Sequence, residues 1–243
     1  MSRIAYVTGG MGGIGTAICR RFHDMGFTVI AGCGPTRDYQ KWLTAQKESG
    51  YEFHASVGDV GDWSSTRAAF EKAAAIGPVD ILVNNAGITR DGTFRKMALD
   101  DWLSVINTNL NSVFHVTKQV IDGMIERKWG RIINISSVNG EKGQFGQTNY
   151  SAAKAGLHGF TMALAREVAR NGVTVNTVAP GYIGTEMVST MRKEVVDKIV
   201  SQIPVGRLGT VEEIASIVGW LASDDAGFTT GAEFSCNGGL HMG

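Results

Sequence analysis

A glycine-rich turn near the N-terminus constrains the fold more than any other feature of this chain. The run Gly9-Gly10-Met11-Gly12-Gly13-Ile14-Gly15 follows a short apolar segment, Ile4–Thr8, and precedes a segment of helical periodicity from Gly15 to about Met25. A strand, a glycine turn and a helix N-terminus in this order form an anion site, because glycines let the backbone approach a pyrophosphate and the helix amides stabilise its charge. The alternative is an ordinary flexible loop. No Lys-Ser/Thr pair follows the turn, so a nucleoside triphosphate loop is disfavoured.

Short β-branched runs alternate with longer segments of helical periodicity along the rest of the chain. Further strands are predicted at Phe27–Ala31, Glu52–Val57, Asp80–Asn84, Arg131–Ser136, Val173–Val178 and Glu233–Ser235. Further helices are predicted at Tyr39–Ser49, Trp63–Ala75, Asp100–Lys128 (in two segments), Tyr150–Asn171, Glu194–Ile203 and Val211–Ser223. This alternation predicts an α/β protein with a single-domain Rossmann fold, in which helices cover both faces of a doubly wound, mostly parallel sheet of about seven strands.

The domain organisation follows from the same pattern. No linker rich in Pro or Ser and no internal repeat interrupts the alternation, so we expect one domain over residues 1–243. The stretch Gly181–Leu208 is the least regular part of the chain. We therefore expect residues 181–208 to form a mobile lid over a substrate.

Composition excludes several classes of protein. The 23 Lys+Arg residues balance 23 Asp+Glu residues, which argues against a protein that mainly binds nucleic acid or an anionic membrane. The three cysteines show no CxxC spacing, so neither a disulfide framework nor a metal site is expected. The apolar run at the N-terminus is too short for a signal peptide, and no stretch reaches the ~18 apolar residues of a membrane span. We expect a cytoplasmic protein.

The end of the second strand bears on the choice of dinucleotide. A dinucleotide fold that binds NAD(H) usually carries an acidic residue there, which binds the adenosine ribose. This chain has Gly32-Cys33-Gly34-Pro35-Thr36-Arg37 instead. The missing carboxylate and the nearby Arg37 favour NADP(H), because a cation suits the 2′-phosphate. The alternative for Arg37 is a solvated surface residue.

Tyr150 and Lys154 are candidates for proton transfer. They stand four residues apart in a predicted helix, which places them on one face. A nearby ammonium favours the phenolate form of a tyrosine, so such a Tyr can exchange a proton closer to neutral pH, as carbonyl reduction requires. Ser136-Ser137 end a predicted strand, where a hydroxyl can bind the carbonyl oxygen of a substrate. Each feature alone is weak evidence.

Taken together, these features resemble the short-chain dehydrogenase/reductase family along nearly the whole chain. Ser137 is preferred over Ser136 because it stands thirteen residues before Tyr150, as in that family. The other matching motifs are Thr8-Gly9-x-x-x-Gly13-x-Gly15, Asp59-Val60, Asn84-Asn85-Ala86-Gly87, Asn109 in Asn107-Thr108-Asn109-Leu110, and Pro180-Gly181 followed by Thr185.

The resemblance implies a set of roles. Tyr150 would be the general acid of reduction, Lys154 would lower the Tyr150 pKa and bind the nicotinamide ribose, and Ser137 would polarise the substrate carbonyl. Asn109 would support, through its helix, a water that links Lys154 to solvent, and NADPH would deliver its 4-pro-S hydride. Besides Tyr150 and Lys154, the residues implied to bind NADPH/NADP are Gly9, Met11, Gly12, Gly13, Ile14, Gly15, Gly32, Cys33, Arg37, Asp59, Val60, Asn85, Ala86, Gly87, Pro180, Gly181 and Ile183.

Longer segments narrow the resemblance to the reductases of 3-oxoacyl thioesters. Asn85–Asp91 and Gly146–Gly156 are similar to that group as a whole, and Ser137–Gln147 and Asn237–Gly243 to those that reduce acetoacetyl-CoA for polyhydroxybutyrate synthesis. The similarity implies NADPH-dependent formation of (R)-3-hydroxybutyryl-CoA. Amide and aromatic groups suit a short polar thioester, so the expected substrate contacts are Asp91, Gln144, Phe145, Gln147 and Tyr182. For Phe145 and Tyr182 the alternative is packing in the core, and for Asp91 it is solvated surface.

Two other functions stay open. A reductase of 3-oxoacyl-[acyl-carrier-protein] in fatty-acid synthesis would favour a basic docking patch, and zero net charge does not exclude one. A catalytically silent nucleotide-binding regulator is a remote alternative, since a fold does not fix function. The long apolar-faced helices Asp100–Arg127 and Tyr150–Ala169 exceed what one sheet face needs. By resemblance, they would pair between subunits of a homotetramer.

Overall fold

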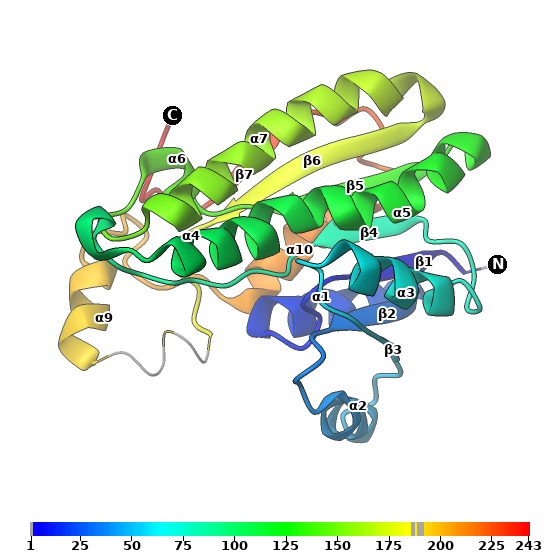
Figure 1. Cartoon of the computed structure of the whole chain (residues 1–243), viewed down its shortest axis with the longest axis horizontal. Helices are drawn as coiled ribbons and strands as arrows, with labels where there is room; N and C mark the ends of the chain where they lie inside the picture. The colour runs from blue at the N-terminus through cyan, green and yellow to red at the C-terminus, as the bar shows by residue number, and fades with distance from the viewer. Residues whose placement is uncertain (1, 186–187, 189–191) are drawn as a thin grey trace.

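The computed structural model describes residues 2–185, 188 and 192–243. Its strands form one sheet in the order β3-β2-β1-β4-β5-β6-β7, and every neighbouring pair is parallel (Figure 1). The strands are β1 (Ile4–Val7), β2 (Thr28–Cys33), β3 (His54–Val57), β4 (Ile81–Asn84), β5 (Gly130–Ile135), β6 (Val173–Pro180) and β7 (Glu233–Cys236). The predicted Rossmann-type α/β fold is confirmed, and its sheet is parallel throughout.

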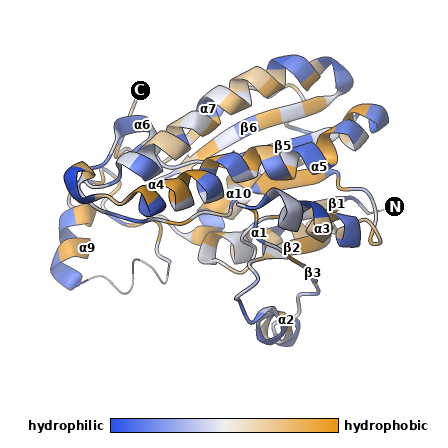
Figure 2. Ribbon diagram, viewed as in Figure 1, coloured by the Kyte–Doolittle hydropathy of each residue, from blue (hydrophilic) through white to orange (hydrophobic). Residues whose placement is uncertain are grey.

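Helices cover both faces of this sheet. They are α1 (Gly13–Asp24), α2 (Tyr39–Glu48), α3 (Trp63–Ala73), α4 (Leu99–Ile106), α5 (Ser112–Arg127), α6 (Val138–Lys142), α7 (Thr148–Val168), α9 (Lys193–Val200) and α10 (Val211–Ala222). Short 3-10 segments lie at Phe94–Lys96 and Ala169–Asn171. Figure 2 shows mostly hydrophobic colours on the strands and mixed colours on the helices that cover them.

Two apolar cores lie on opposite faces because alternate side chains of a strand point in opposite directions. In β1, Ala5 and Val7 join the core beneath α1 and α10, whereas Ile4 and Tyr6 join the core beneath α3, α5 and α7. The ring of Tyr6 stacks on that of Phe70 from α3, with the ring centres 4.3 Å apart. The sheet is therefore buried on both sides, as a doubly wound fold requires.

A ladder of buried polar side chains links the central strands to α7. Asn84 donates to Asn134 (2.8 Å), and Asn134 donates to Thr161 (2.8 Å). The hydroxyl of Thr161 also hydrogen-bonds that of Thr177, again at 2.8 Å. Because these groups are almost completely buried, leaving any one unpaired would be costly. The ladder therefore fixes α7 over β4, β5 and β6.

The observed elements differ from the predicted ones mainly at their ends. The two helical segments predicted within Asp100–Lys128 are joined by a turn with π-helical hydrogen bonding, η2 (Asn107–Asn111). The sequence pattern predicted no helix or strand where α6 lies. Strand β6 ends two residues after Val178, the predicted end of that strand. Helix α5 ends where Lys128 adopts the left-handed conformation (φ 54°).

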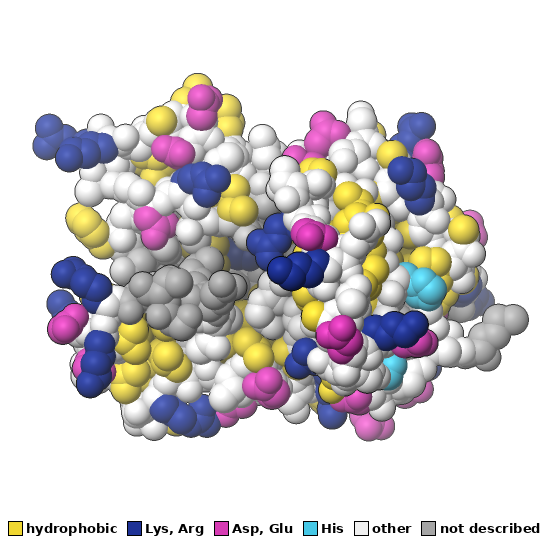
Figure 3. Space-filling view, turned by 90° about the horizontal axis from the view of Figure 1, so that it is seen from below, with side chains coloured by type: hydrophobic (Ala, Val, Ile, Leu, Met, Phe, Trp, Pro, Cys, Tyr) yellow, Lys and Arg dark blue, Asp and Glu magenta, His cyan; other side chains and the backbone are white. Residues whose placement is uncertain are grey.

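The predicted lid contains residues 186–187 and 189–191, which lie outside the described residues. Its described part holds α9, and a bridge joins Ile183 to Gly209 at its start. Within the described ranges no helix is both long and apolar enough to cross a membrane, and no three His, Cys, Asp or Glu side chains gather as a metal site. On the face seen in Figure 3, cationic and anionic side chains are interspersed.

Candidate active site

The glycine turn leaves the N-terminus of α1 open. Gly12 is the N-cap residue of α1, no side chain caps it, and the first turn carries no acidic residue. A Cβ at Gly15 would lie 2.2 Å from the carbonyl oxygen of Gly9, so only glycine fits at position 15. Gly9 itself has φ +62°, which glycine adopts without strain. Free helix amides beside a close-packed backbone fit the pyrophosphate of a dinucleotide.

Thr8 and Asn85 tie this turn to the end of β4. The Thr8 hydroxyl accepts hydrogen bonds from the backbone N–H groups of Asn85 (2.9 Å) and Ala86 (3.0 Å). The Asn85 side chain donates in return to the carbonyls of Thr8 (2.9 Å) and Gly9 (3.2 Å). Met11 and Ile14 pack against the core from within the turn. The motifs around residues 9–15 and 85–87 thus form one rigid unit.

The residues expected to distinguish NADP(H) from NAD(H) lie at the end of β2. A Cβ at Gly32 would lie 3.1 Å from the Tyr6 ring, so the chain is tightly packed there. Cys33 is buried and its thiol donates to the carbonyl of Ala31, which turns its side chain inward. Arg37 is exposed. An exposed cation beside an uncharged strand end is compatible with a 2′-phosphate.

Asp59 and Val60 lie after β3. The Asp59 carboxylate accepts from the backbone N–H of Gly61 (2.9 Å), and its own N–H donates to Ser65 (2.9 Å). Val60 is half-buried against the core, and its carbonyl oxygen lies 3.0 Å from the His115 ring nitrogen. The turn that carries both residues is therefore held in place from several sides.

Tyr150 and Lys154 lie one turn apart on α7, and Ser137 lies just beyond the end of β5. Lys154 is buried, and its ammonium donates to the carbonyl of Ile135 (2.7 Å). The same Nζ lies 5.7 Å from the centre of the Tyr150 ring. Ser137 lies close enough to Tyr150 to lower the pKa of its phenol. The structure thus brings together the three residues that the sequence motifs single out.

The protonation of this group differs from the sequence-based expectation. Burial raises the pKa of Tyr150, the nearby Ser137 hydroxyl lowers it in part, and the Asp91 carboxylate raises it further. Burial also lowers the pKa of Lys154 to about 8. Because the ammonium is itself poorly solvated and bound to a carbonyl, it does not reverse the effect of burial on the phenol. In the protein alone, Tyr150 is a protonated phenol.

Asn109 is fully buried in the π-helical turn η2. Its side chain pairs with the backbone of Ile88, accepting from the N–H (2.8 Å) and donating to the carbonyl (2.7 Å). A Cβ at Gly87 would lie 3.0 Å from the Asn109 oxygen and 3.6 Å from the Lys154 ammonium. Gly87 therefore lets the chain after β4 pass between Asn109 and Lys154. Irregular π turns often occur at functional sites.

A hydrogen-bonded chain leads from Asp91 to Ser137. Asp91 accepts from the side chain of Gln147 (2.9 Å), which accepts from the side chain of Asn139 (2.9 Å). The backbone N–H of Asn139 donates to the Ser137 hydroxyl oxygen (3.2 Å). Sequence reasoning missed Asn139, although its position two residues after Ser137 places it in the first turn of α6. Through Asn139, Asp91 and Gln147 therefore help to hold the Ser137 side chain in place.

The remaining candidate substrate residues separate into two groups. Burial and the Asp91 carboxylate raise the pKa of Tyr182, and the same carboxylate raises the pKa of Tyr150. Gln144 instead accepts from the exposed Lys142 (3.0 Å), and Phe145 is 87% exposed. Core packing, the alternative considered for Phe145, is therefore wrong. Phe145 lies on a surface loop between α6 and α7.

The segment after β6 borders the glycine turn. Pro180 is buried, and the N–H of Gly181 donates to the carbonyl of Cys236 (2.9 Å). A Cβ at Gly13 would lie 3.1 Å from the Thr185 methyl group. Ile183, 6% exposed, packs into the core under α1 and α10. The predicted nicotinamide segment thus lies beside the N-terminus of α1.

Comparison with known proteins assigns the family. A profile described as short chain dehydrogenase matches residues 3–196, most of the chain. The chain belongs to the short chain dehydrogenase family. Members of this family are oxidoreductases that use a nicotinamide cofactor, and the open helix end and glycine cradle of this structure fit one.

Relatives that match over nearly the full length include proteins with two reductase names. An "Acetoacetyl-CoA reductase" of Cupriavidus necator is 68% identical over 99% of both chains. A second protein of that name, from Allochromatium vinosum, is 54% identical over 100% of both. A "3-oxoacyl-[acyl-carrier-protein] reductase" of Pseudomonas aeruginosa is 47% identical over 99% of this chain and 98% of its own. The first name accompanies the higher identities.

Proposed function

We propose that this short-chain dehydrogenase reduces acetoacetyl-CoA to (R)-3-hydroxybutyryl-CoA with NADPH, in the cytoplasm, and so supplies monomer for polyhydroxybutyrate synthesis. The observation that carries the proposal is the arrangement of Ser137, Tyr150 and Lys154 around one point, beside an open helix N-terminus. The full-length relatives named for acetoacetyl-CoA support the substrate.

In this mechanism the nicotinamide, when bound, supplies the hydride to the carbonyl carbon. Tyr150 donates a proton to the carbonyl oxygen, and its raised pKa keeps the phenol protonated before the reaction. The Ser137 oxygen accepts from the N–H of Asn139. When a substrate is bound, the Ser137 O–H can donate to the same carbonyl oxygen and stabilise the charge that develops there.

Lys154 and Asn109 prepare the site for the next turnover. Lys154, with a pKa of about 8, lies near enough to neutrality to exchange a proton with its surroundings. Both polar atoms of the Asn109 side chain are bound to Ile88, so the side chain holds the π turn in shape. We propose that this turn supports the water through which Lys154 reaches solvent.

The choice of NADPH rests on the second strand end. Arg37 is exposed beside the buried Gly32 and Cys33, and no acidic residue stands between them in the sequence. A guanidinium there binds a 2′-phosphate, whereas a ribose hydroxyl gains little from it. The proposed dinucleotide ligands are Gly9, Met11–Gly15, Gly32, Cys33, Arg37, Asp59, Val60, Asn85–Gly87, Tyr150, Lys154, Pro180, Gly181 and Ile183.

The acyl-carrier-protein reductase is the second candidate, because one full-length relative bears that name. The deciding experiment compares kcat/KM for acetoacetyl-CoA and for an acetoacetyl carrier protein, each with NADPH and with NADH. The proposal predicts higher kcat/KM for acetoacetyl-CoA and for NADPH. A strong preference for the carrier protein would assign the second function, and no thioester-dependent oxidation of either dinucleotide would favour the silent regulator.

We also propose a homotetramer. Phe114 on α5, Leu103 on α4 and Met162 on α7 are exposed by 57%, 44% and 53%, and these helices lie side by side in Figure 1. Trp63 at the start of α3 stacks on Phe114 with ring centres 6.0 Å apart. Apolar side chains in such numbers on adjacent helices are typical of a subunit interface.

A further inference from the structure

A second group of hydrogen-bonded side chains lies behind the candidate active site. Ser136 is buried, its hydroxyl donates to the main-chain carbonyl of Lys154 (2.9 Å), and its oxygen lies 2.8 Å from His158 Nε2. His158 Nδ1 lies 3.0 Å from a carboxylate oxygen of Glu233. The Glu141 carboxylate lies close enough to Glu233 to raise its pKa, and Glu141 accepts from the hydroxyl of Ser235. The chain of contacts runs from the edge strand β7 to Lys154.

These residues resemble a nucleophilic Ser-His-acid arrangement, but the geometry excludes that use. The Ser136 hydroxyl is only 3% exposed, so a substrate does not reach it. In the structure the hydroxyl donates its proton to the Lys154 carbonyl, so it is not directed toward His158 for attack on a substrate. The chain is not a proton wire either, because it ends on a carbonyl, which accepts a hydrogen bond but does not pass a proton on.

The positions of the protons on Ser136, His158 and Glu233 depend on one another. While Ser136 donates to the Lys154 carbonyl, its oxygen can only accept from His158, which requires a proton on Nε2. In the neutral ring, Nδ1 is then an acceptor and needs a protonated Glu233 as its donor. When Glu233 is ionised, the favoured tautomer carries its proton on Nδ1. Nε2 then accepts from Ser136, and the Lys154 carbonyl loses its side-chain donor.

We propose that Ser136, His158 and Glu233 are positioning residues for Lys154, and that the His158 tautomer, set by the proton on Glu233, decides whether Ser136 holds the Lys154 carbonyl. Ser136 immediately precedes Ser137, and its N–H donates to Val178 of β6 (2.7 Å). The relay therefore couples the end of the sheet to the helix turn that carries Lys154. This proposal depends on the proposed function only for the role of Lys154 in proton transfer.

The charges around the relay support a change near neutral pH. Burial and the neighbouring Glu141 raise the pKa of Glu233 to about 7. Burial lowers the pKa of His158, and Glu141 on α6 partly opposes this. Lys154, one turn before His158 on α7, directs its ammonium to the carbonyl of Ile135. The Glu233 side chain is 33% exposed and so can exchange its proton with solvent, whereas that of His158 is 17% exposed.

The test uses the full-length protein and pairs of matched variants. His158→Gln keeps an amide donor near the Nε2 position, and His158→Asn keeps one near Nδ1. Ser136→Ala and His158→Asn should lower kcat about tenfold with KM changed less than threefold, because Lys154 is displaced while the substrate contacts remain. His158→Gln should retain most of the wild-type kcat. Thr177→Val removes a buried hydrogen bond to the same helix and should leave kcat unchanged.

The pH dependence of kcat and the NMR signals of the His158 ring nitrogens distinguish a positioning role from a purely structural one. In the wild type, kcat should show an inflection near pH 7 that Glu233→Gln abolishes, because the amide does not titrate. Nitrogen NMR of the His158 ring should report the Nε2–H tautomer below pH 7 and Nδ1–H above it. This readout needs no substrate, so it tests the relay even if acetoacetyl-CoA is not reduced. An unchanged tautomer across this range, or wild-type kcat in both Ser136→Ala and His158→Asn, would overturn the proposal.

Discussion

Lys154 combines a functional position with a cost in stability. Its side chain is fully buried, and its ammonium is bound to the carbonyl of Ile135. Burial disfavours the charged form, which lowers the pKa of Lys154 to about 8. Such costs are common at functional sites, where the surrounding structure holds a group in an unfavourable environment. The cost can be measured separately from activity.

Lys154→Met should raise the free energy of unfolding at pH 7 by about 1 to 3 kcal/mol while abolishing reduction. The folded-state pKa is depressed, so between about pH 8 and the ordinary value of 10.5 the unfolded chain binds more protons than the native protein. Wild-type stability therefore rises with pH across this interval, and the advantage of the variant should shrink. Urea unfolding at pH 7 and pH 9.5 measures both values; a less stable variant at pH 7 would contradict the account.

At the residue scale, the sequence indicated which side chains lie together better than it indicated their burial and contacts. The spacing of Tyr150, Lys154 and Ser137 predicted that these side chains lie together, because helix geometry and family motifs fix their relation. The direction of the Tyr150 pKa was predicted wrongly, since burial depends on packing that no motif encodes. Asn139 was missed for the same reason: its role lies in a contact with Gln147 on another segment.

At the scale of elements, α10 shows how local sequence defines a helix start. Thr210 accepts from the N–H of Glu213 (3.2 Å), and the Glu213 carboxylate accepts from the N–H of Thr210 (2.8 Å), which is a capping box. Glu213 also pairs with Arg207 (2.7 Å), and this pair lowers the Glu213 pKa to about 2. The box fixes the chain that leads from the Ile183–Gly209 bridge into the core.

Thr210→Ala should lower the free energy of unfolding by about 1 kcal/mol, since an unpaired N–H remains at the helix start. The box lies outside the candidate site, so kcat/KM should stay within twofold of wild type. Thr210→Ser, which keeps the hydroxyl, is the matched control and should unfold like wild type. A Thr210→Ala protein as stable as the control would show that the cap contributes nothing.

Periodicity predicted most elements to within a few residues, as for α2 and α3, and failed where an element is short or irregular. Helix α6 spans five residues, fewer than a periodic pattern needs. The π turn at Asn107–Asn111 has no sequence signature of its own, because its hydrogen bonds depend on the fit of Asn109 against Ile88. The strand order also depends on long-range packing, and the periodicity of the sequence does not indicate it.

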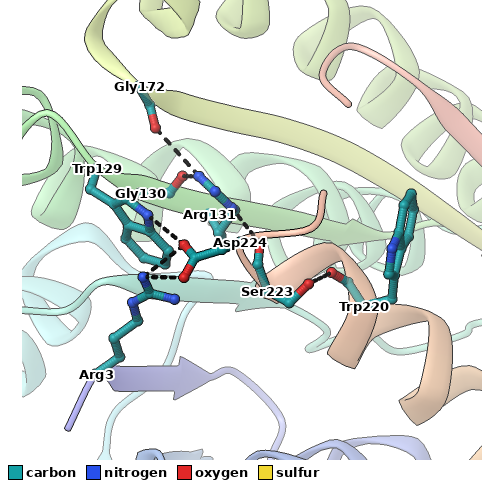
Figure 4. Close-up of polar contacts among 8 residues, drawn as sticks. All are labelled: Arg3, Trp129, Gly130, Arg131, Gly172, Trp220, Ser223 and Asp224. Atoms are coloured by element: carbon teal, nitrogen blue, oxygen red, sulfur yellow. Dashed lines mark hydrogen bonds and ion pairs between the residues drawn. The ribbon is translucent and has the colours of Figure 1, made fainter. Parts of the chain in front are cut away.

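At the scale of the whole molecule, a cluster at the amino end of β5 joins distant parts of the chain (Figure 4). Arg131 is 4% exposed and donates to the carbonyls of Ser223 (3.1 Å), Gly130 (2.9 Å) and Gly172 (3.4 Å). Near it, Arg3 forms an ion pair with Asp224 (2.8 Å), and both guanidinium groups lie over the Trp129 ring. The cluster connects β1, β5 and the end of α10.

Arg131→Met should destabilise the protein by about 3 kcal/mol, because the buried guanidinium is lost together with its hydrogen bonds to three carbonyls. The cluster lies at the opposite end of the strands from Ser137, so kcat should not change. Arg3→Met, at a more exposed position, should cost less than 1 kcal/mol. Equal losses in the two variants, measured by denaturant unfolding, would contradict this assignment.

The proposed tetramer makes its own prediction. Wild-type protein should scatter light as a tetramer, and Phe114→Glu should shift it to smaller species, because a buried unpaired carboxylate is costly at an apolar interface. Phe228→Glu changes a fully exposed Phe outside these helices and should leave the tetramer intact. A monomeric wild type, or a Phe114→Glu protein that remains tetrameric, would refute this interface.

The central claim is that Tyr150 is the proton donor of an NADPH-dependent reduction of acetoacetyl-CoA. Its most direct test follows NADPH consumption with acetoacetyl-CoA in wild type and in Tyr150→Phe, with thermal unfolding as a check that both are folded. The account predicts clear turnover in wild type and a fall of about 10²- to 10⁴-fold in kcat for the variant, at an unchanged melting temperature. Wild-type turnover in a folded Tyr150→Phe protein would contradict it.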